Sequence, residues 1–126
     1  MVPKDLLYTK QHEWVRTDGS KATVGITDFA QNALGDITFV DLPPVGKAVE
    51  RGQEACAIES CKAAASVYAP ASGKVCQVNA AVGEDPSLVN SDCYGRGWIY
   101  QVELSDKGDL GTLLTPQQYE EFLAAA

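Results

Sequence analysis

The stretch around Lys62 constrains the fold more than any other part of the chain. A strand-like run, residues 53–58, lies between Gly52 and the acidic Glu59. A second run, residues 67–69, leads to Pro70 and Gly73 and then to a third, residues 75–78. Two strand-like runs joined by a short polar link and bounded by turn residues predict a β-hairpin. Lys62 would lie at its tip, where Ala63 and Ala64 leave room for the active site of another protein.

Chain length, composition and net charge limit the classes of protein to which this sequence can belong. With 126 residues, the chain is long enough for one domain, and we expect residues 1–126 to form a single one. Its 45% apolar and 21% charged residues are typical of globular proteins. The net charge of −7 argues against a nucleic acid as the main partner, because phosphate binding needs clustered cations.

The sequence contains no sign of export, membrane insertion or metal binding. Residues 1–8 lack the apolar core of a secretion signal, and no apolar run approaches the roughly 20 residues of a membrane helix. The four cysteines form no C-x-x-C pair and His12 is the only histidine, so no zinc-ligand spacing is present. We therefore expect reduced thiols and a cytoplasmic location in a bacterium, or the mitochondrial matrix for a processed eukaryotic chain.

The remaining runs predict a mostly β protein with short helices. Residues 8–16 and 22–26 predict an N-terminal hairpin, and residues 37–42 and 98–104 predict further strands. Asp28 is expected to cap a short helix that ends at Gly35, and residues 90–97 are expected to form an irregular loop. Thr115, Pro116 and Gln118 predict the start of a C-terminal helix whose apolar face packs on the sheet.

No usual catalytic constellation is present in the sequence. A nucleophilic lysine needs a desolvated pocket, and a hairpin tip of alanine and serine offers little desolvation. An exposed lysine is better suited to carry an acyl-linked cofactor between enzymes. We therefore expect a protein without catalytic activity of its own, with a lysine enzyme as the alternative.

The stretch around the lysine, Glu59-Ser60-Cys61-Lys62-Ala63-Ala64, has a distinctive pattern, whereas biotin carriers have Met on both sides of the lysine and lipoyl domains of 2-oxo acid dehydrogenases have Asp-Lys-Ala. Further motifs are Tyr8-Thr9, His12-Glu13-Trp14-Val15, residues 24–28, Ala30-Gln31, residues 34–37, residues 39–43, Tyr68-Ala69-Pro70, Ser72-Gly73, Val78-Asn79, Leu88-Val89-Asn90 and Tyr94-Gly95-x-Gly97-Trp98. Together these motifs, which extend along nearly the whole chain, resemble the glycine cleavage system H protein, a lipoyl-carrying shuttle.

The resemblance implies a barrel-sandwich hybrid fold, as in lipoyl and biotinyl carriers, with lipoate in amide linkage on Lys62. It also implies glycine decarboxylase (a pyridoxal-phosphate enzyme), folate-dependent aminomethyltransferase, dihydrolipoyl dehydrogenase and a lipoate ligase or lipoyltransferase as partners, with no nucleic acid and no membrane. The protein would carry the aminomethyl group between the first two enzymes and be reoxidised by the third. An alternative is a donor that relays lipoate to 2-oxo acid dehydrogenase complexes.

Some positions depart from the family pattern. The family has Val where this chain has Cys61 and an acid where it has Ser66. An acid at position 66 would hold the cationic aminomethyl arm, so Glu13 becomes the main candidate for that contact. Glu13 and Ser66 are therefore the candidate arm contacts, beside Lys62, Glu59, Ser60 and Ala63 at the attachment site.

Overall fold

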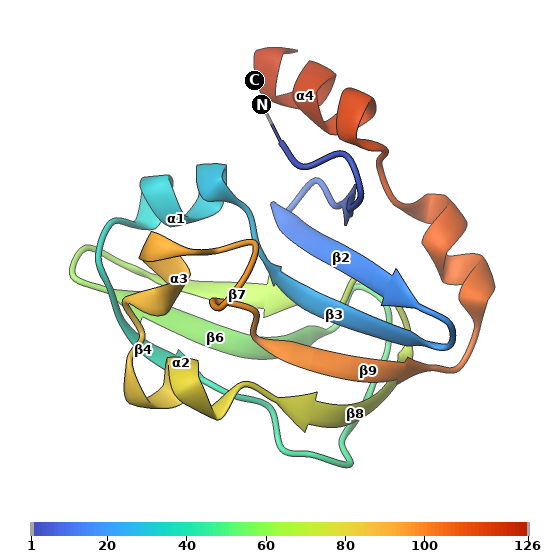
Figure 1. Ribbon diagram of the computed structural model, residues 1–126, viewed down its shortest axis with the longest axis horizontal. Coiled ribbons are helices and arrows are strands. Elements are labelled where there is room, and N and C mark those ends of the chain that lie inside the picture. Colours follow the sequence, from blue (N-terminus) through green and yellow to red (C-terminus); the bar gives the residue numbers. More distant parts are fainter. Residues whose placement is uncertain (1, 126) are drawn as a thin grey trace.

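Two antiparallel sheets form the body of the computed structural model, which describes residues 2–125. The strands of the larger sheet, in spatial order, are β1 (Leu7–Tyr8), β2 (Glu13–Asp18), β3 (Lys21–Ile26), β9 (Tyr100–Leu104), β8 (Gly73–Val78) and β5 (Ala48–Val49). The smaller sheet contains β4 (Ile37–Asp41), β6 (Glu54–Ser60) and β7 (Ala64–Tyr68), in the order β4-β6-β7. The two sheets face one another as layers (Figure 1). The predicted barrel-sandwich fold is confirmed.

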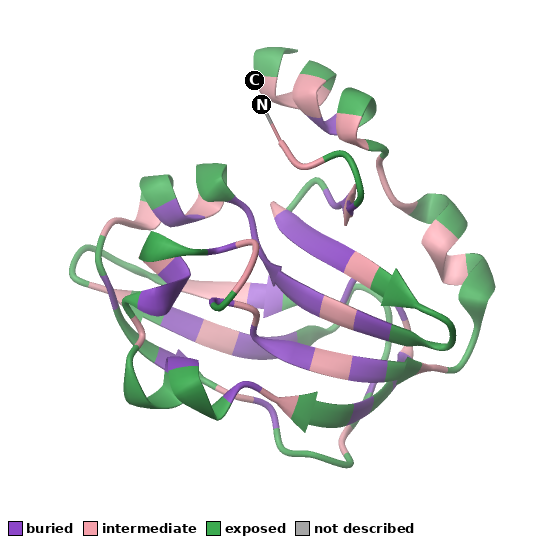
Figure 2. Cartoon of the chain, viewed as in Figure 1, coloured by how far each residue is buried: buried purple, intermediate pink, exposed green. Residues whose placement is uncertain are grey.

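The hydrophobic core lies between the two sheets. Buried residues alternate with more exposed ones along β9 and over the first half of β8, as expected for strands with one face on the core (Figure 2). Val24, Ile58 and Tyr100 come from β3, β6 and β9, and each is 0% exposed. The core therefore joins the sheet that contains the β6–β7 hairpin to the larger sheet.

The predicted N-terminal hairpin is present, but its first strand is interrupted. Residues 9–12 form a turn between β1 and β2, and His12 has a φ of 69°. The hydroxyl of Thr9 accepts hydrogen bonds from the backbone N–H groups of Gln11 and Glu13, which stabilises this turn. The expectation of one continuous strand over residues 8–16 was wrong, because the Thr9 side chain bonds the backbone locally and so favours a turn at residues 9–12.

Three short helices connect the strands at one end of the sheets. They are α1 (Asp28–Leu34), α2 (Ala80–Glu84) and α3 (Leu88–Ser91). The N-cap of α1 is Thr27 and not Asp28 as predicted, since the Thr27 hydroxyl accepts the N–H of Ala30 at 3.3 Å. The sequence did not predict α2, and it placed Asn90, the third residue of α3, in an irregular loop. Both helices are too short to show a helical period in the sequence.

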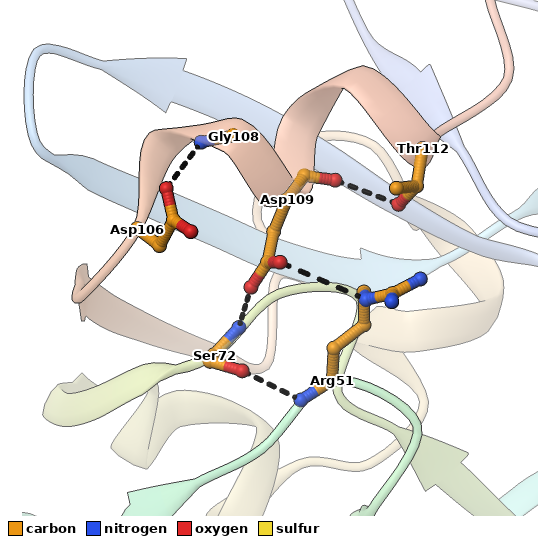
Figure 3. Close-up of polar contacts among 6 residues, drawn as sticks. All are labelled: Arg51, Ser72, Asp106, Gly108, Asp109 and Thr112. Atoms are coloured by element: carbon orange, nitrogen blue, oxygen red, sulfur yellow. Dashed lines mark hydrogen bonds and ion pairs between the residues drawn. The ribbon is translucent and has the colours of Figure 1, made fainter.

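The chain ends with a 3₁₀ segment, η1 (Lys107–Thr112), and the helix α4 (Pro116–Ala125). The Asp109 carboxylate accepts the N–H of Ser72 at 2.8 Å and lies 3.7 Å from Nε of Arg51 (Figure 3). The Ser72 hydroxyl in turn accepts the N–H of Arg51 at 2.9 Å. These contacts attach η1 to the turns that precede β6 and β8.

The predicted start of the C-terminal helix is confirmed. The Thr115 hydroxyl accepts the N–H of Gln118, and the Gln118 side chain accepts the N–H of Thr115, which is a capping box. Tyr119 is fully buried and stacks on Tyr8 with a centroid distance of 4.7 Å, so α4 packs on the β1 side of the larger sheet. Phe122 is only half-buried. Among the described residues, no helix is long and apolar enough to cross a membrane.

Candidate functional site: the β6–β7 hairpin and its support

The predicted hairpin is present, and Lys62 lies in its three-residue loop. In the antiparallel pairing of β6 with β7, Glu59 lies opposite Ala64. The backbone N–H of Ser60 donates a hydrogen bond to the carbonyl of Ala63 at 2.8 Å. The loop projects past α1 on the left of Figure 1. Lys62 and Ala63 are exposed. An exposed amine with a small neighbour is accessible to the active site of another protein.

The Ser60 side chain stabilises the loop from within. Its hydroxyl accepts the N–H groups of Lys62 at 3.2 Å and of Ala63 at 3.1 Å. A serine hydroxyl that bonds the backbone two or three residues ahead replaces water at otherwise unpaired N–H groups. Ser60 therefore orders the backbone of Lys62. Glu59, the other predicted member, is exposed next to it and pairs in register with Phe39 of β4.

The loop between α1 and β4 supports the tip from outside. The carbonyl of Asp36 accepts the N–H of Cys61 at 3.1 Å. Gly35 has a φ of 79°, and a Cβ at this position would lie 3.0 Å from Cε of Lys62. The Lys62 side chain therefore runs closely over the Gly35 backbone, where only glycine leaves space.

Asn90 of α3 fixes that supporting loop. Its side-chain amide donates to the carbonyl of Gly35 and to the Gln31 side chain, both at 2.9 Å. Its carbonyl oxygen accepts the N–H of Ile37 at 2.9 Å. Asn90 belongs to the matching motif Leu88-Val89-Asn90, but the sequence alone indicated no role for it. Three hydrogen bonds from one amide now show that it orders residues 35–37, and thereby the tip.

Glu13 lies away from the tip, at the other end of β7. It is 1% exposed; its carboxylate accepts the Thr9 hydroxyl at 2.5 Å and the N–H of Tyr68 at 3.1 Å. Burial raises the pKa of Glu13, and these two hydrogen bonds oppose the rise. Tyr68 is six residues after Lys62, about 20 Å along an extended strand. The structure therefore does not bring Glu13 next to the lysine.

A cavity of about 360 Å³ opens beside Glu13. Its lining includes Thr9, Glu13, Arg51 and Tyr68. The Glu13 residue thus borders this cavity, whereas Ser66 is half-buried on the outer side of β7, nearer the tip. The two candidate arm contacts belong to different places on the surface.

Ser66 has an acidic partner that the sequence did not reveal. Its hydroxyl donates to a carboxylate oxygen of Glu54 at 2.8 Å. Glu54 pairs with Tyr68, and the register shifts between Glu54 and Cys56, so a bulge brings Glu54 next to Ser66. Because a bulge changes which residues face each other, strand alternation alone could not have identified this pair.

The described side chains include no group of three or more His, Cys, Asp or Glu residues arranged to hold a metal ion. All four cysteines are free thiols, as expected: Cys61 and Cys76 are exposed, and Cys56 and Cys93 are buried. Burial raises the pKa of both Cys56 and Cys93 to about 12, so these two thiols stay protonated at neutral pH.

Two packed sheets, with an exposed lysine at the tip of a hairpin that hydrogen bonds hold in place, define a carrier protein of the barrel-sandwich class. A family model described as "Glycine cleavage H-protein" matches residues 6–126. The chain belongs to the glycine cleavage H-protein family. This membership confirms the predicted role, a lipoyl-carrying protein of glycine cleavage, and the comparisons do not favour the alternative of a lipoate donor.

Individual relatives agree with this assignment. The chain is 51% identical over 123 residues to the glycine cleavage system H protein of Carboxydothermus hydrogenoformans, covering 98% of this chain and 95% of that one. It is 52% identical over 117 residues to that of Thermotoga maritima, covering 93% and 94%. A crystal structure of a glycine cleavage system H protein from Mycobacterium marinum superposes with a TM-score of 0.91 at 38% identity, over 98% of this chain and 99% of that one.

Proposed function

We propose that Lys62 is the residue to which lipoate is attached, through an amide with its side-chain nitrogen. One observation carries this proposal: Lys62 is exposed at a tip whose backbone is ordered by Ser60 and by Asp36. The surroundings fit the group, because the adjacent Ala63 and Ala64 are small and exposed and leave the amine open to an acylating enzyme. Glu59, Ser60 and Ala63 complete the attachment site.

Lipoate would supply a disulfide that accepts the aminomethyl group from glycine and is later restored by reoxidation. The chain itself would contribute only position, because a group held on a rigid support is presented to each docked enzyme at high local concentration. We infer that the chain acts as one lipoyl-carrier domain without catalysis of its own. The exposed Lys62 supports this, since a nucleophilic lysine requires desolvation.

The partners that follow are glycine decarboxylase, the folate-dependent aminomethyltransferase, dihydrolipoyl dehydrogenase and a lipoate ligase or lipoyltransferase. We place the protein in the bacterial cytoplasm. The bacterial relatives and the four free thiols support that compartment.

Peptide mapping and intact mass test the attachment site. Wild type incubated with lipoate, ATP and a lipoate ligase should gain one lipoyl group on Lys62. Lys62→Arg should gain none, because a guanidinium does not form this amide under these conditions. Lys74→Arg is the matched control, since Lys74 is also exposed, and it should react as wild type does. Lipoate on another lysine of Lys62→Arg would contradict the proposal.

We further propose that Ser66 and Glu54 together form the surface contact for the cationic aminomethyl cargo. Glu54 supplies the carboxylate that position 66 lacks, at a hydrogen-bonded distance of 2.8 Å from Ser66. Ser66 is four residues after Lys62, about 13 Å along the strand, which is nearer than Glu13. The engaged and buried Glu13 is then a second contact, reached through its cavity.

Spontaneous ammonia release from loaded protein, without the transferase, tests this contact. Glu54→Gln should release ammonia faster than wild type by a modest factor, because an exposed ion pair contributes about 0–1 kcal/mol. High salt should reduce the difference, since screening acts within about 10 Å at 0.1 M. Glu84→Gln, an exposed acid on α2, is the control. Equal rates for all three proteins at low salt would refute the contact.

A further inference from the structure

Two nucleophilic side chains lie next to each other at the tip of the β6–β7 hairpin. Cys61 has an exposed free thiol, and Lys62 is exposed beside it. A Cβ on Gly35 would lie 3.8 Å from Sγ of Cys61 and 3.7 Å from Nζ of Lys62. Consecutive side chains on an extended strand point to opposite sides. In this loop, by contrast, the thiol and the amine face the same point above the Gly35 backbone.

Backbone hydrogen bonds hold the two residues in this arrangement. The N–H of Cys61 donates to the carbonyl of Asp36 at 3.1 Å, and the N–H of Lys62 donates to the hydroxyl of Ser60 at 3.2 Å. Both side chains therefore leave a backbone that is fixed, and only their own torsions remain free. Groups held together in this way react with each other much faster than the same groups in dilute solution, because folding has already removed most of the entropy of their encounter.

The two groups have complementary roles in acyl chemistry. Near neutral pH, a thiol presents more of its nucleophilic form than an ammonium group does, so a thiol reacts first with an activated acyl group. An amine gives the more stable product, because an amide resists exchange with thiols whereas a thioester does not. Lys62 is also the proposed acceptor of lipoate, which is itself an acyl group. A fast-reacting thiol thus lies beside an acyl acceptor.

We propose that Cys61 and Lys62 together accept acyl groups from thioesters without the help of an enzyme. Sγ of Cys61 attacks the thioester carbonyl carbon, the carbon–sulfur bond of the donor breaks, and the donor thiol leaves with the proton of the Cys61 thiol. Nζ of Lys62 loses one proton to solvent and attacks the new thioester on Cys61. An amide forms, the bond to Sγ breaks, and a second proton from the amine restores the thiol, so no oxidant or reductant is consumed.

The charge around the tip favours one class of donor. Asp36 and Glu59, which flank the two nucleophiles, are exposed acids, and the chain has a net charge of −7. An anionic donor is repelled by these charges. We therefore expect small thioesters with an uncharged thiol part to react best. The proposal rests on the geometry of the tip and uses no ligase, so it does not depend on the attachment of lipoate.

Peptide mapping after incubation with S-acetyl-N-acetylcysteamine, an uncharged acetyl thioester, tests the proposal at about pH 8 on unmodified protein. Lys62 should be acetylated about tenfold or more faster than Lys107, an exposed lysine on η1 without a neighbouring cysteine in the sequence. Cys61→Ser, which nearly keeps the side-chain size, should lower the rate at Lys62 to that at Lys107. Cys76→Ser removes the other exposed thiol and should leave the rate unchanged.

Two further measurements follow the intermediate and the choice of donor. Lys62→Arg should accumulate an acetyl group on Cys61 that hydroxylamine removes, whereas the acetyl group on Lys62 of wild type should resist hydroxylamine. Acetyl-coenzyme A, which is anionic, should react more slowly than the uncharged donor, and added salt should reduce the difference. Equal rates for the two donors at low salt would overturn the selection by charge.

Equal rates of acetylation at Lys62 in wild type and Cys61→Ser would overturn the proposal. A rate at Lys62 no higher than that at Lys107 would also overturn it, even if Cys61 becomes acetylated, because the thiol would then not pass its acyl group to the amine. Lipoylation of Cys61→Ser by a ligase is measured separately and should match wild type. Wild type that gains no lipoate would refute the attachment proposed above and leave the acetylation result unaffected.

Discussion

Replacing Gly35 by alanine should affect both stability and the site, by separate routes. Gly35 has φ 79° and ψ −155°, a backbone conformation that is essentially restricted to glycine. Forcing a residue with a Cβ into this region costs about 1–3 kcal/mol. For a domain of this size we expect the melting temperature to fall by about 4–12 °C.

The added Cβ would also lie 3.0 Å from Cε of Lys62 and 3.7 Å from its Nζ. This contact should add little to the stability loss, because the end of a flexible lysine can swing away. It should instead move the amine, so Gly35→Ala should be lipoylated more slowly than wild type. We therefore expect the stability loss to be the same in a Lys62→Ala background, within about 0.5 kcal/mol.

Urea unfolding measures the first effect, and initial rates of lipoylation under native conditions measure the second. Gly111→Ala is the matched control, because Gly111 has no positive φ and a Cβ there would meet nothing within 4 Å. Its unfolding free energy should stay within about 0.5 kcal/mol of wild type. An unfolding midpoint of Gly35→Ala equal to that of Gly111→Ala would refute the backbone argument. A lipoylation rate equal to wild type would refute the steric one.

Four further predictions concern α4 and the aromatic contacts at its start. Thr115→Ala should lower the free energy of unfolding in denaturant by about 0.5–2 kcal/mol, because the helix loses its N-cap. Phe122→Ala should lower it by about 2 kcal/mol, because the Phe122 ring is only half-buried. Unfolding midpoints equal to that of wild type would show that α4 does not pack as described. Tyr119→Phe should lower the free energy of unfolding by about 1–3 kcal/mol, since the Tyr119 hydroxyl lies 2.8 Å from both His12 Nδ1 and Thr27 Oγ1. An unchanged unfolding midpoint would contradict this expectation. Burial lowers the pKa of His12 from its ordinary value of 6.5. The contribution of neutral His12 to stability is therefore present above pH 6.5 and is lost as pH falls through the folded-state pKa. The decrease in the denaturant midpoint of unfolding between about pH 7.5 and about pH 5 should be smaller in His12→Asn than in wild type.

Local signals predicted the elements that present the site. The hairpin around Lys62 follows from two β-rich runs separated by a short polar link. The start of α4 follows from Thr115, Pro116 and Gln118, whose roles depend only on residues within one helical turn. Where neighbours along the chain settle the structure, the sequence was sufficient.

Contacts between distant segments were not predictable in the same way. The support of the tip joins Asn90 to Gly35 and Ile37, 55 and 53 residues away. The Glu54–Ser66 pair depends on a bulge, and Glu13 is buried by a turn that broke an expected strand. Each of these results from the packing of one element on another, so no periodicity in a single segment could indicate it.

These contacts also explain how a small, exposed tip can be well ordered. Ser60 bonds the loop N–H groups from within, and Asp36 holds the N–H of Cys61 from outside. Asn90 then fixes the residues on both sides of Asp36, and α3, which contains Asn90, places Leu88 and Val89 in the core. The backbone of the attachment site is thus tied to the core in three steps, while the Lys62 side chain remains exposed. A carrier needs both properties, because the arm must move between enzymes while each enzyme must meet the same protein surface.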